Sequence, residues 1–242
     1  TPERTTFEVW GPTAESAVVR LYDGDSLAQE IAMTRGQSGL WSATAEGDQR
    51  GKLYAFQLTV DGKTLKETAG IFAKAVGVNG DRGAIIDLRD TDPEGWAEDK
   101  APKFKPSERV IYEMHYRDMT AHTSSGVEHP GKYLGMAERG TRSKEGLATG
   151  LDHLVELGVT HVHLLPTADF GSIDESKPTD QYNWGYELKN YSAPEGTYST
   201  NPADAEARIR ELKTLVKAMH DAGLCVVLDV VYNHTTSTEN CG

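Results

Sequence analysis

The feature that most constrains the fold is an alternation of short apolar runs and amphipathic helical repeats that begins near residue 110. The apolar runs predict strands at 110–115, 159–165 and 224–232. Between them, apolar residues recur at helical spacing in two stretches: Leu147, Leu151, Leu154 and Val155 in the first, and Ile209, Leu212, Val216 and Met219 in the second. Strand, helix, strand, helix, strand is the βαβ pattern of a parallel sheet.

Turn-forming residues bound the two predicted helices. Ser143 is the candidate N-cap of the first helix, and Gly158 is its stop. Asn201-Pro202 opens the second helix with a cap and a first-turn proline, and Gly223 ends it. Each helix is therefore joined to the following strand by little more than a glycine.

The connections from strand to helix are much longer. They cover residues 116–143 and 166–200, about 28 and about 35 residues, whereas unstructured loops beyond about 15 residues are uncommon in compact domains and usually carry function. Both leave the carboxyl ends of strands, where α/β barrels build their active sites. The sequence therefore predicts a functional site at that edge of the sheet.

A different periodicity governs the N-terminal part of the chain. Phe7 and Val9 alternate with polar neighbours, as strand residues do when one face of a sheet is buried. Residues 53–60 form a longer run of strand type, which Asp61-Gly62 closes as a hairpin turn would. These signals predict an antiparallel β-sandwich.

The boundary between the two patterns falls in residues 92–108, which are rich in proline and charge as linkers are. We therefore divide the chain into a β-sandwich at 1–105 and an α/β part at 106–242. Trp10 and Trp41 of the sandwich are expected to be core residues, because a tryptophan in such a module more often packs inside it than binds a ligand.

Two segments near the carboxyl end of the predicted sheet carry the chemistry. Residues 229–234 read Asp-Val-Val-Tyr-Asn-His and turn polar just as the third apolar run ends. Residues 182–186 read Tyr-Asn-Trp-Gly-Tyr, with three large aromatic rings around one glycine that lets them approach a ligand. Flat apolar rings beside hydrogen-bonding groups suit a sugar ring, whose faces are apolar and whose rim is hydroxyl. Together the segments predict a carbohydrate ligand.

These segments resemble the α-amylase superfamily of glycoside hydrolases, and within it the type I pullulanases, which debranch glycogen and starch. Residues 229–234 resemble the first signature region of the superfamily, and residues 182–186 resemble the motif that sets type I pullulanases apart. Residues 110–115 resemble the first barrel strand. The resemblance implies a carbohydrate-binding-type β-sandwich followed by the first three β/α units of a TIM (β/α)8 barrel. It also implies hydrolysis of α-glucans, at the α-1,6 branch linkages of pullulan, glycogen or starch.

The same resemblance implies roles in a sugar subsite. Tyr186 would stack on the glucose ring at the bond to be cleaved, and His234 would donate hydrogen bonds to a hydroxyl of that ring. Trp184, interpreted as a wall of the subsite, and Asn233 complete the substrate-binding set. Asn233 also matches a position that binds calcium in some α-amylases. One side-chain oxygen falls far short of the six to eight ligands that calcium takes, so we predict no cofactor or metal.

Other polar residues are expected to support the subsite from behind. Asp229 would brace the site, through an arginine beyond residue 242, and does not look like a nucleophile because its flanks are apolar. His115 and Asp118 lie around the end of the first strand and are interpreted in the same way. His161 and His163 alternate along the second strand and are expected to be satisfied groups in the core or behind the site.

The barrel and its chemistry are incomplete in this sequence. A closed α/β barrel takes eight strand-helix units and typically about 250 residues, whereas only about 135 follow the linker. Retaining hydrolysis takes two carboxyl groups about 5 Å apart, and no position here matches the family's nucleophile aspartate or acid glutamate. We expect these residues beyond residue 242, on a continuation of the chain or on a second polypeptide that stays bound. A non-catalytic glucan-binding protein with a remnant barrel is the alternative.

Composition excludes several other classes of function. The net charge of −12 argues against nucleic acid as a partner, because its phosphates would be repelled. No apolar run approaches the roughly 20 residues of a membrane span. No Cys or His spacing suggests zinc, and no Gly-x-Gly-x-x-Gly follows a strand. The cell compartment stays open, with a secreted or cell-surface location favoured over the cytoplasm.

Overall fold

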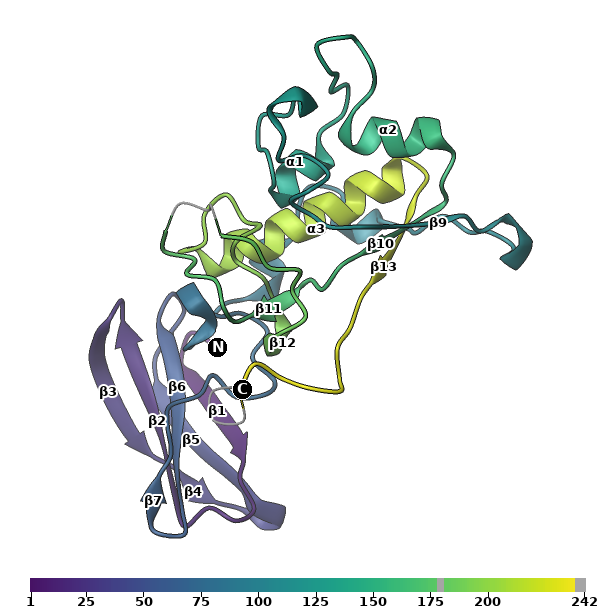
Figure 1. The fold of residues 1–242 in the computed structure, drawn as a ribbon. Helices are drawn as coiled ribbons and strands as arrows, with labels where there is room; N and C mark the ends of the chain where they lie inside the picture. Colours follow the sequence, from purple (N-terminus) through teal and green to yellow (C-terminus); the bar gives the residue numbers. More distant parts are fainter. Residues whose placement is uncertain (178–180, 238–242) are drawn as a thin grey trace.

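The computed structural model describes residues 1–177 and 181–237 of the chain. An all-β part, purple and blue in Figure 1, is followed by an α/β part, teal to yellow, that holds all three α-helices. The two parts lie against each other, with helix α3 and the pair β11–β12 nearest the junction. No helix in the described ranges is long and apolar enough to cross a membrane.

The N-terminal part consists of two antiparallel sheets that share one apolar core. The first sheet has the order β1-β5-β4 and the second β3-β2-β6-β7, with β8 pairing on β6. Their bounds are β1 Arg4–Trp10, β2 Ser16–Asp23, β3 Ser26–Ala32, β4 Thr34–Arg35, β5 Leu40–Glu46, β6 Leu53–Val60, β7 Lys63–Thr64 and β8 Gly83–Ala84. Phe7, Val19 and Leu21 meet in the core because alternate residues of each strand point inward.

The hairpin predicted at Asp61-Gly62 is confirmed. Both residues have positive φ, 49° and 68°, and the turn pairs Val60 with Lys63. Positive φ at both central positions is the geometry of a type I′ turn, whose twist matches that of the flanking strands.

The two tryptophans of the sandwich behave differently. Trp41 is buried as predicted, with 5% of its surface exposed, and its ring nitrogen donates to the carbonyl of Gly11 at 3.0 Å. The prediction for Trp10 is wrong, because 61% of its surface is exposed. Strand residues alternate between faces, and Phe7 points inward, so Trp10 three positions later must point outward.

The α/β part is built on a parallel sheet of three strands in the order β13-β10-β9. Val162 and Leu164 of β10 are fully buried in a core shared with α2 and α3, whereas His161 and His163 lie on the opposite face. The bounds are β9 Ile111–Met114, β10 His161–Leu164, β13 Cys225–Leu228, α1 Tyr133–Ala137, α2 Gly150–Leu157 and α3 Ala205–Asp221. The predicted βαβαβ order is therefore confirmed.

The starts of the two predicted helices are wrong, and their ends are right. Helix α2 follows Thr149, because Ser143 is part of a tight turn in which its N–H donates to the carbonyl of Leu147. The Asp204 carboxylate, not Asn201, caps α3 by accepting two N–H groups of its first turn. Gly158 and Gly223 end the helices with φ of 79° and 83°.

The long strand-to-helix connections are more ordered than the sequence predicts. Residues 116–143 include α1, and residues 166–200 include an antiparallel pair, β11 Ala168–Phe170 and β12 Leu188–Pro194. Residues 178–180 of the second connection lie outside the described residues. The third strand is shorter than predicted, because β13 ends at Leu228 and the polar segment that follows leaves the sheet.

The segment between the two parts lies along helix α3. Lys213 of α3 donates to the carbonyl of Leu88 at 3.1 Å and to the hydroxyl of Thr91 at 2.7 Å. His220 at the end of the helix meets Asp99 at 2.7 Å. The division of the chain at residue 105 stays a prediction.

Candidate functional site

The aromatic motif (residues 182–186) and the segment after β13 meet through one hydrogen bond. The hydroxyl of Tyr186 donates to Asp229 Oδ2 at 2.8 Å. Burial, together with this bond, raises the pKa of Tyr186 to about 12, so the phenol keeps its proton at neutral pH. The bond anchors the tip of the ring at the carboxyl end of the sheet.

A histidine lies beneath this pair on the sheet. His163 Nε2 is 3.7 Å from Asp229 Oδ2, and His163 Nδ1 is 3.6 Å from Glu113 Oε2. The three side chains come from three neighbouring strands or their ends and share the face away from the helices. The prediction that His163 supports the site fits this placement. Glu113 was missed, although its position in β9, two residues before His115, was a usable signal.

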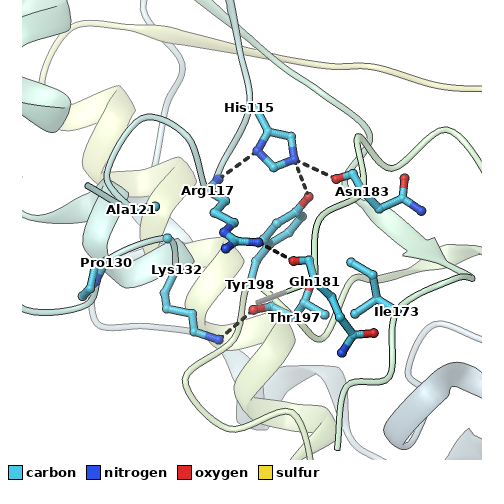
Figure 2. A pocket seen from close by; sticks show the side chains of 11 residues that line it. His115, Arg117, Ala121, Pro130, Lys132, Ile173, Gln181, Asn183, Thr197 and Tyr198 are labelled. Carbon is cyan, nitrogen blue, oxygen red and sulfur yellow. Dashed lines mark hydrogen bonds between the residues drawn. The ribbon is translucent and has the colours of Figure 1, made fainter. Parts of the chain in front are cut away.

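His115 ties the aromatic motif to the end of β9 (Figure 2). Its Nδ1 accepts the N–H of Arg117 at 3.2 Å, so the ring proton is on Nε2. That Nε2–H lies 3.0 Å from both the carbonyl of Asn183 and the hydroxyl of Tyr198. Burial lowers the pKa of His115, which favours this neutral form. These contacts are compatible with the role predicted for His115 in supporting the subsite, and that role stays a prediction.

Asp118 holds the first ring of the motif. It accepts a hydrogen bond from the hydroxyl of Tyr182 at 2.9 Å, and that ring lies 5.1 Å from the ring of His115. The guanidinium of Arg117 lies over the Tyr182 ring, 5.9 Å from its centroid, and donates to the carbonyl of Gln181. These contacts hold the hydroxyl and the ring of Tyr182, although 48% of its surface stays exposed.

Gly185 is needed for a reason other than approach to a ligand. It has φ of 93°, and a Cβ there would lie 3.1 Å from the carbonyl of Pro166 and 3.2 Å from the ring of Phe170. Asn183 Oδ1 stabilises the turn by accepting the N–H of Gly185 at 2.8 Å. The turn points Tyr186 toward Asp229 and leaves Trp184 with 61% of its surface exposed. An exposed ring at the edge of the motif is compatible with the role predicted for Trp184 as a wall of the sugar subsite.

Asn233 and His234 lie apart from this cluster. Both side chains are exposed and contact each other, with His234 Nδ1 3.1 Å from Asn233 Oδ1. The carbonyl of His234 accepts from Tyr191 at 2.9 Å, which anchors the segment. Within residues 1–177 and 181–237, the one group of three acidic, histidine or cysteine side chains lies elsewhere, and the expectation of no metal at Asn233 stays a prediction.

A cavity of about 160 Å³ lies behind the aromatic motif (Figure 2). His115, Arg117, Lys132, Asn183, Thr197 and Tyr198 are among its lining residues. Lys132 donates to the carbonyl of Thr197 at 2.7 Å, and burial lowers the pKa of its ammonium group. The cavity is smaller than the roughly 300–1,000 Å³ of typical ligand pockets, so it belongs to the support of the site.

The group of possible metal ligands is buried between α3 and the pair β11–β12, and the sequence reasoning missed it. Carboxylate oxygens of Asp169, Glu175 and Glu195 lie within 4.8 Å of one another. Arg208 makes a two-pronged contact with Glu175, at 3.0 and 2.5 Å, and lies 3.6 Å from Asp169. Burial, with the neighbouring carboxylates, raises the pKa of Asp169 to about 7 and that of Glu195 well above its usual range. An arginine and retained protons thus balance the charge.

Comparisons with known proteins agree with this architecture. The family described as alpha amylase, catalytic domain, matches residues 90–241, and carbohydrate-binding module 48 (isoamylase N-terminal domain) matches residues 1–70. Similar curated relatives include the pullulanase of Bacillus subtilis (strain 168), 42% identical over 99% of this chain and 33% of the relative. Chloroplastic pullulanase 1 of Arabidopsis thaliana is 31% identical over 97% of this chain and 28% of the relative. The chain thus spans about a third of the length of these relatives.

Solved structures give the same result. The apo pullulanase from Paenibacillus barengoltzii superposes with a TM-score of 0.94 at 47% identity, covering 97% of this chain and 37% of that one. The pullulanase from Bacillus acidopullulyticus superposes with a TM-score of 0.93 at 41% identity, covering 98% and 29%. The chain therefore belongs to the α-amylase family of glycoside hydrolases, with an amino-terminal domain of the carbohydrate-binding module 48 type.

Proposed function

We propose that this chain is the amino-terminal portion of a pullulanase-type glycoside hydrolase that cleaves α-1,6 branch linkages of pullulan, glycogen or starch. The hydrogen bond of 2.8 Å between Tyr186 and Asp229 is the observation that carries the proposal. It joins the motif that resembles pullulanases to the signature region of the superfamily, and it orients a ring to stack on a sugar. Relatives that cover nearly all of this chain are named pullulanases.

The ligand class follows from the exposed groups and from the relatives. Tyr186 offers a ring face, Trp184 a rim, and His234 with Asn233 a pair of exposed hydrogen-bonding groups. One structure of the Paenibacillus barengoltzii enzyme is a complex with maltotriose, and another is a complex with maltohexaose and α-cyclodextrin. Because these are α-glucan oligosaccharides, they support an α-glucan as the partner of this chain.

The chemistry that we propose is retaining hydrolysis by two carboxyl groups about 5 Å apart. Both groups, the nucleophile Asp and the acid Glu, would lie outside the 242 residues, on later strands of the barrel. The residues described here bind and orient the sugar: Tyr186 stacks on the ring, and Asp229 holds Tyr186. No step of bond cleavage is assigned to them.

The proposal includes a barrel that continues past β13. The outer strands carry exposed apolar residues, among them Ile111 of β9 and Leu228 of β13. Both faces of a parallel sheet need to be covered. The exposure of these side chains therefore favours further strands, supplied by a continuation of the chain or by a bound second polypeptide.

The test is hydrolysis of pullulan by the complete protein. We expect maltotriose as the product, with the anomeric configuration retained when it is followed by NMR. Linear α-1,4 maltooligosaccharides should be poor substrates. Binding of maltotriose without release of reducing ends from pullulan would favour the non-catalytic glucan-binding protein instead.

A further inference from the structure

A turn of the N-terminal part inserts into the α/β part. Residues 77–81 place Asn79 in the left-handed region, with φ of 61°, and Gly80 next to it with φ of 66°. A Cβ on Gly80 would overlap the carboxylate of Asp169, so the backbone of the turn is in direct contact with the buried acidic group. Asn190 of β12 donates to the carbonyl of Gly80 at 2.9 Å.

Glu175 is the residue that receives this turn. Its Oε2 accepts the N–H of Asn79 at 2.7 Å, and its own N–H donates to Asn79 Oδ1 at 2.8 Å, so the two residues form a reciprocal pair. Arg208 holds the same carboxylate and also donates to the carbonyl of Gly77 at 3.1 Å. Nearly the whole Glu175 side chain is buried, so each of these bonds lies in a medium of low dielectric, where polar networks are rigid.

The same carboxylate reaches the support of the sugar subsite. Glu175 Oε1 accepts the N–H of Gly196 at 3.1 Å. Two residues later, the hydroxyl of Tyr198 lies 3.0 Å from His115 Nε2, whose proton also points to the carbonyl of Asn183 at 3.0 Å. Hydrogen bonds, together with the backbone from Gly196 to Tyr198, therefore connect Asn79 to the aromatic motif.

We propose that Asn79 is a positioning residue for the sugar subsite, so that the N-terminal module helps to set the aromatic motif in place. The proposal rests on the proposed function for the identity of the subsite, but the coupling itself rests on contacts alone. Without the Asn79 side chain, the N–H of Glu175 loses its acceptor and Asp174 loses a bond of 3.4 Å from Asn79 Nδ2. The backbone N–H of residue 79 still donates to the Glu175 carboxylate, so the loosening begins at the Glu175 backbone. Gly196 and Tyr198 then gain freedom, and His115 holds Asn183 less firmly.

The test is Asn79→Gly in the complete protein, because glycine keeps the positive φ and removes only the side chain. Asp61→Gly is the matched control. Asp61 also has positive φ, at 49°, but lies exposed in the β6–β7 hairpin, at the turn that pairs Val60 with Lys63. Lys189→Met is a second variant should Asn79→Gly not fold. It removes the bond of 2.7 Å to the carbonyl of Asn79 together with the ion pair to Asp81.

We expect amide hydrogen exchange of residues 181–187 to speed up roughly tenfold in Asn79→Gly, the effect of losing the partly buried bond between the Glu175 N–H and Asn79 Oδ1, with helix α2 unchanged. The KM for pullulan should rise several-fold with kcat less affected, and Asp61→Gly should match the wild type. Equal acceleration in α2 would mean general destabilisation and overturn the proposal, as would unchanged exchange at 181–187. Local acceleration in a protein inactive on pullulan would sink the proposed function and leave the coupling standing.

Discussion

The two parts of the molecule bury their apolar residues to different degrees. Val19, Leu21 and Ala55 in the N-terminal sheets have no exposed surface. In the α/β part, Val162 and Leu164 are equally buried on the helix side of β10, but the outer strands leave large apolar side chains open. The sandwich closes its core with its own two sheets, whereas a parallel sheet needs cover on both faces. The stability of the sandwich should therefore be local, and that of the α/β part should depend on further polypeptide.

The largest effect is expected inside the sandwich core. Trp41→Ala should lower the free energy of unfolding by about 3–5 kcal/mol, because it empties a closed apolar site. Trp10→Ala is the matched variant, and since most of its ring is exposed it should change stability by less than about 0.5 kcal/mol. Urea titration of both variants measures the difference. Equal losses would mean that Trp10 is covered in the folded protein and that the sandwich does not close by itself.

The next effect concerns the junction where the two parts meet. Gly80→Ala should destabilise by about 3 kcal/mol, because the new methyl group overlaps the Asp169 carboxylate and the backbone has positive φ. Gly62→Ala isolates the backbone contribution, because Gly62 has φ of 68° and open space around it. That control should lose only about 1 kcal/mol. The excess loss in Gly80→Ala, read from chemical denaturation, measures how tightly the turn is held.

Sequence patterns predicted much of this structure, and the failures have physical causes. Local rules sufficed for the Asp61-Gly62 hairpin and for the αL stops at Gly158 and Gly223, because the backbone conformation is set by the residue itself. The predictions of Ser143 and Asn201 as N-caps were wrong. Several nearby residues can cap a helix, and tertiary contacts determine which of them does so. The burial predicted for Trp10 was wrong, because the face of the strand on which a residue lies decides its burial more than its hydrophobicity does.

The candidate site shows the same limit. The motif residues were found because they are contiguous in sequence, and the structure brings Tyr186 to Asp229 across the sheet. The buried group around Arg208 was missed, because its members come from distant segments and none has a distinctive neighbour in sequence. Charged residues on a helix such as α3 normally face solvent, so a fully buried arginine has no local signal.

A smaller effect is expected at the proposed sugar subsite of the α/β part. Tyr186→Ala should lower kcat/KM on pullulan about 100-fold, because the ring platform is lost where the sugar distorts. Tyr186→Phe keeps the ring and removes only the bond to Asp229, so we expect a loss of about tenfold. Initial-rate kinetics of the complete protein separate the two. Wild-type rates in both variants would remove Tyr186 from the subsite.

The last expected effect is a pH dependence that starts from the buried acidic group at the junction. The pKa of Asp169 is raised from its usual value to about 7 by burial and by Glu175, so the folded state binds a proton more tightly than the unfolded chain. The stabilisation is complete below the unfolded pKa near 4 and is lost as pH rises through about 7, with a slope of at most about 1.4 kcal/mol per pH unit for one proton. Asp169→Asn cannot ionise and still presents an oxygen to Asn190, so its unfolding free energy should fall less steeply between pH 4 and 7. Parallel curves for variant and wild type, from denaturant titrations across this range, would show that Asp169 is ionised in the folded protein and that Arg208 alone balances it.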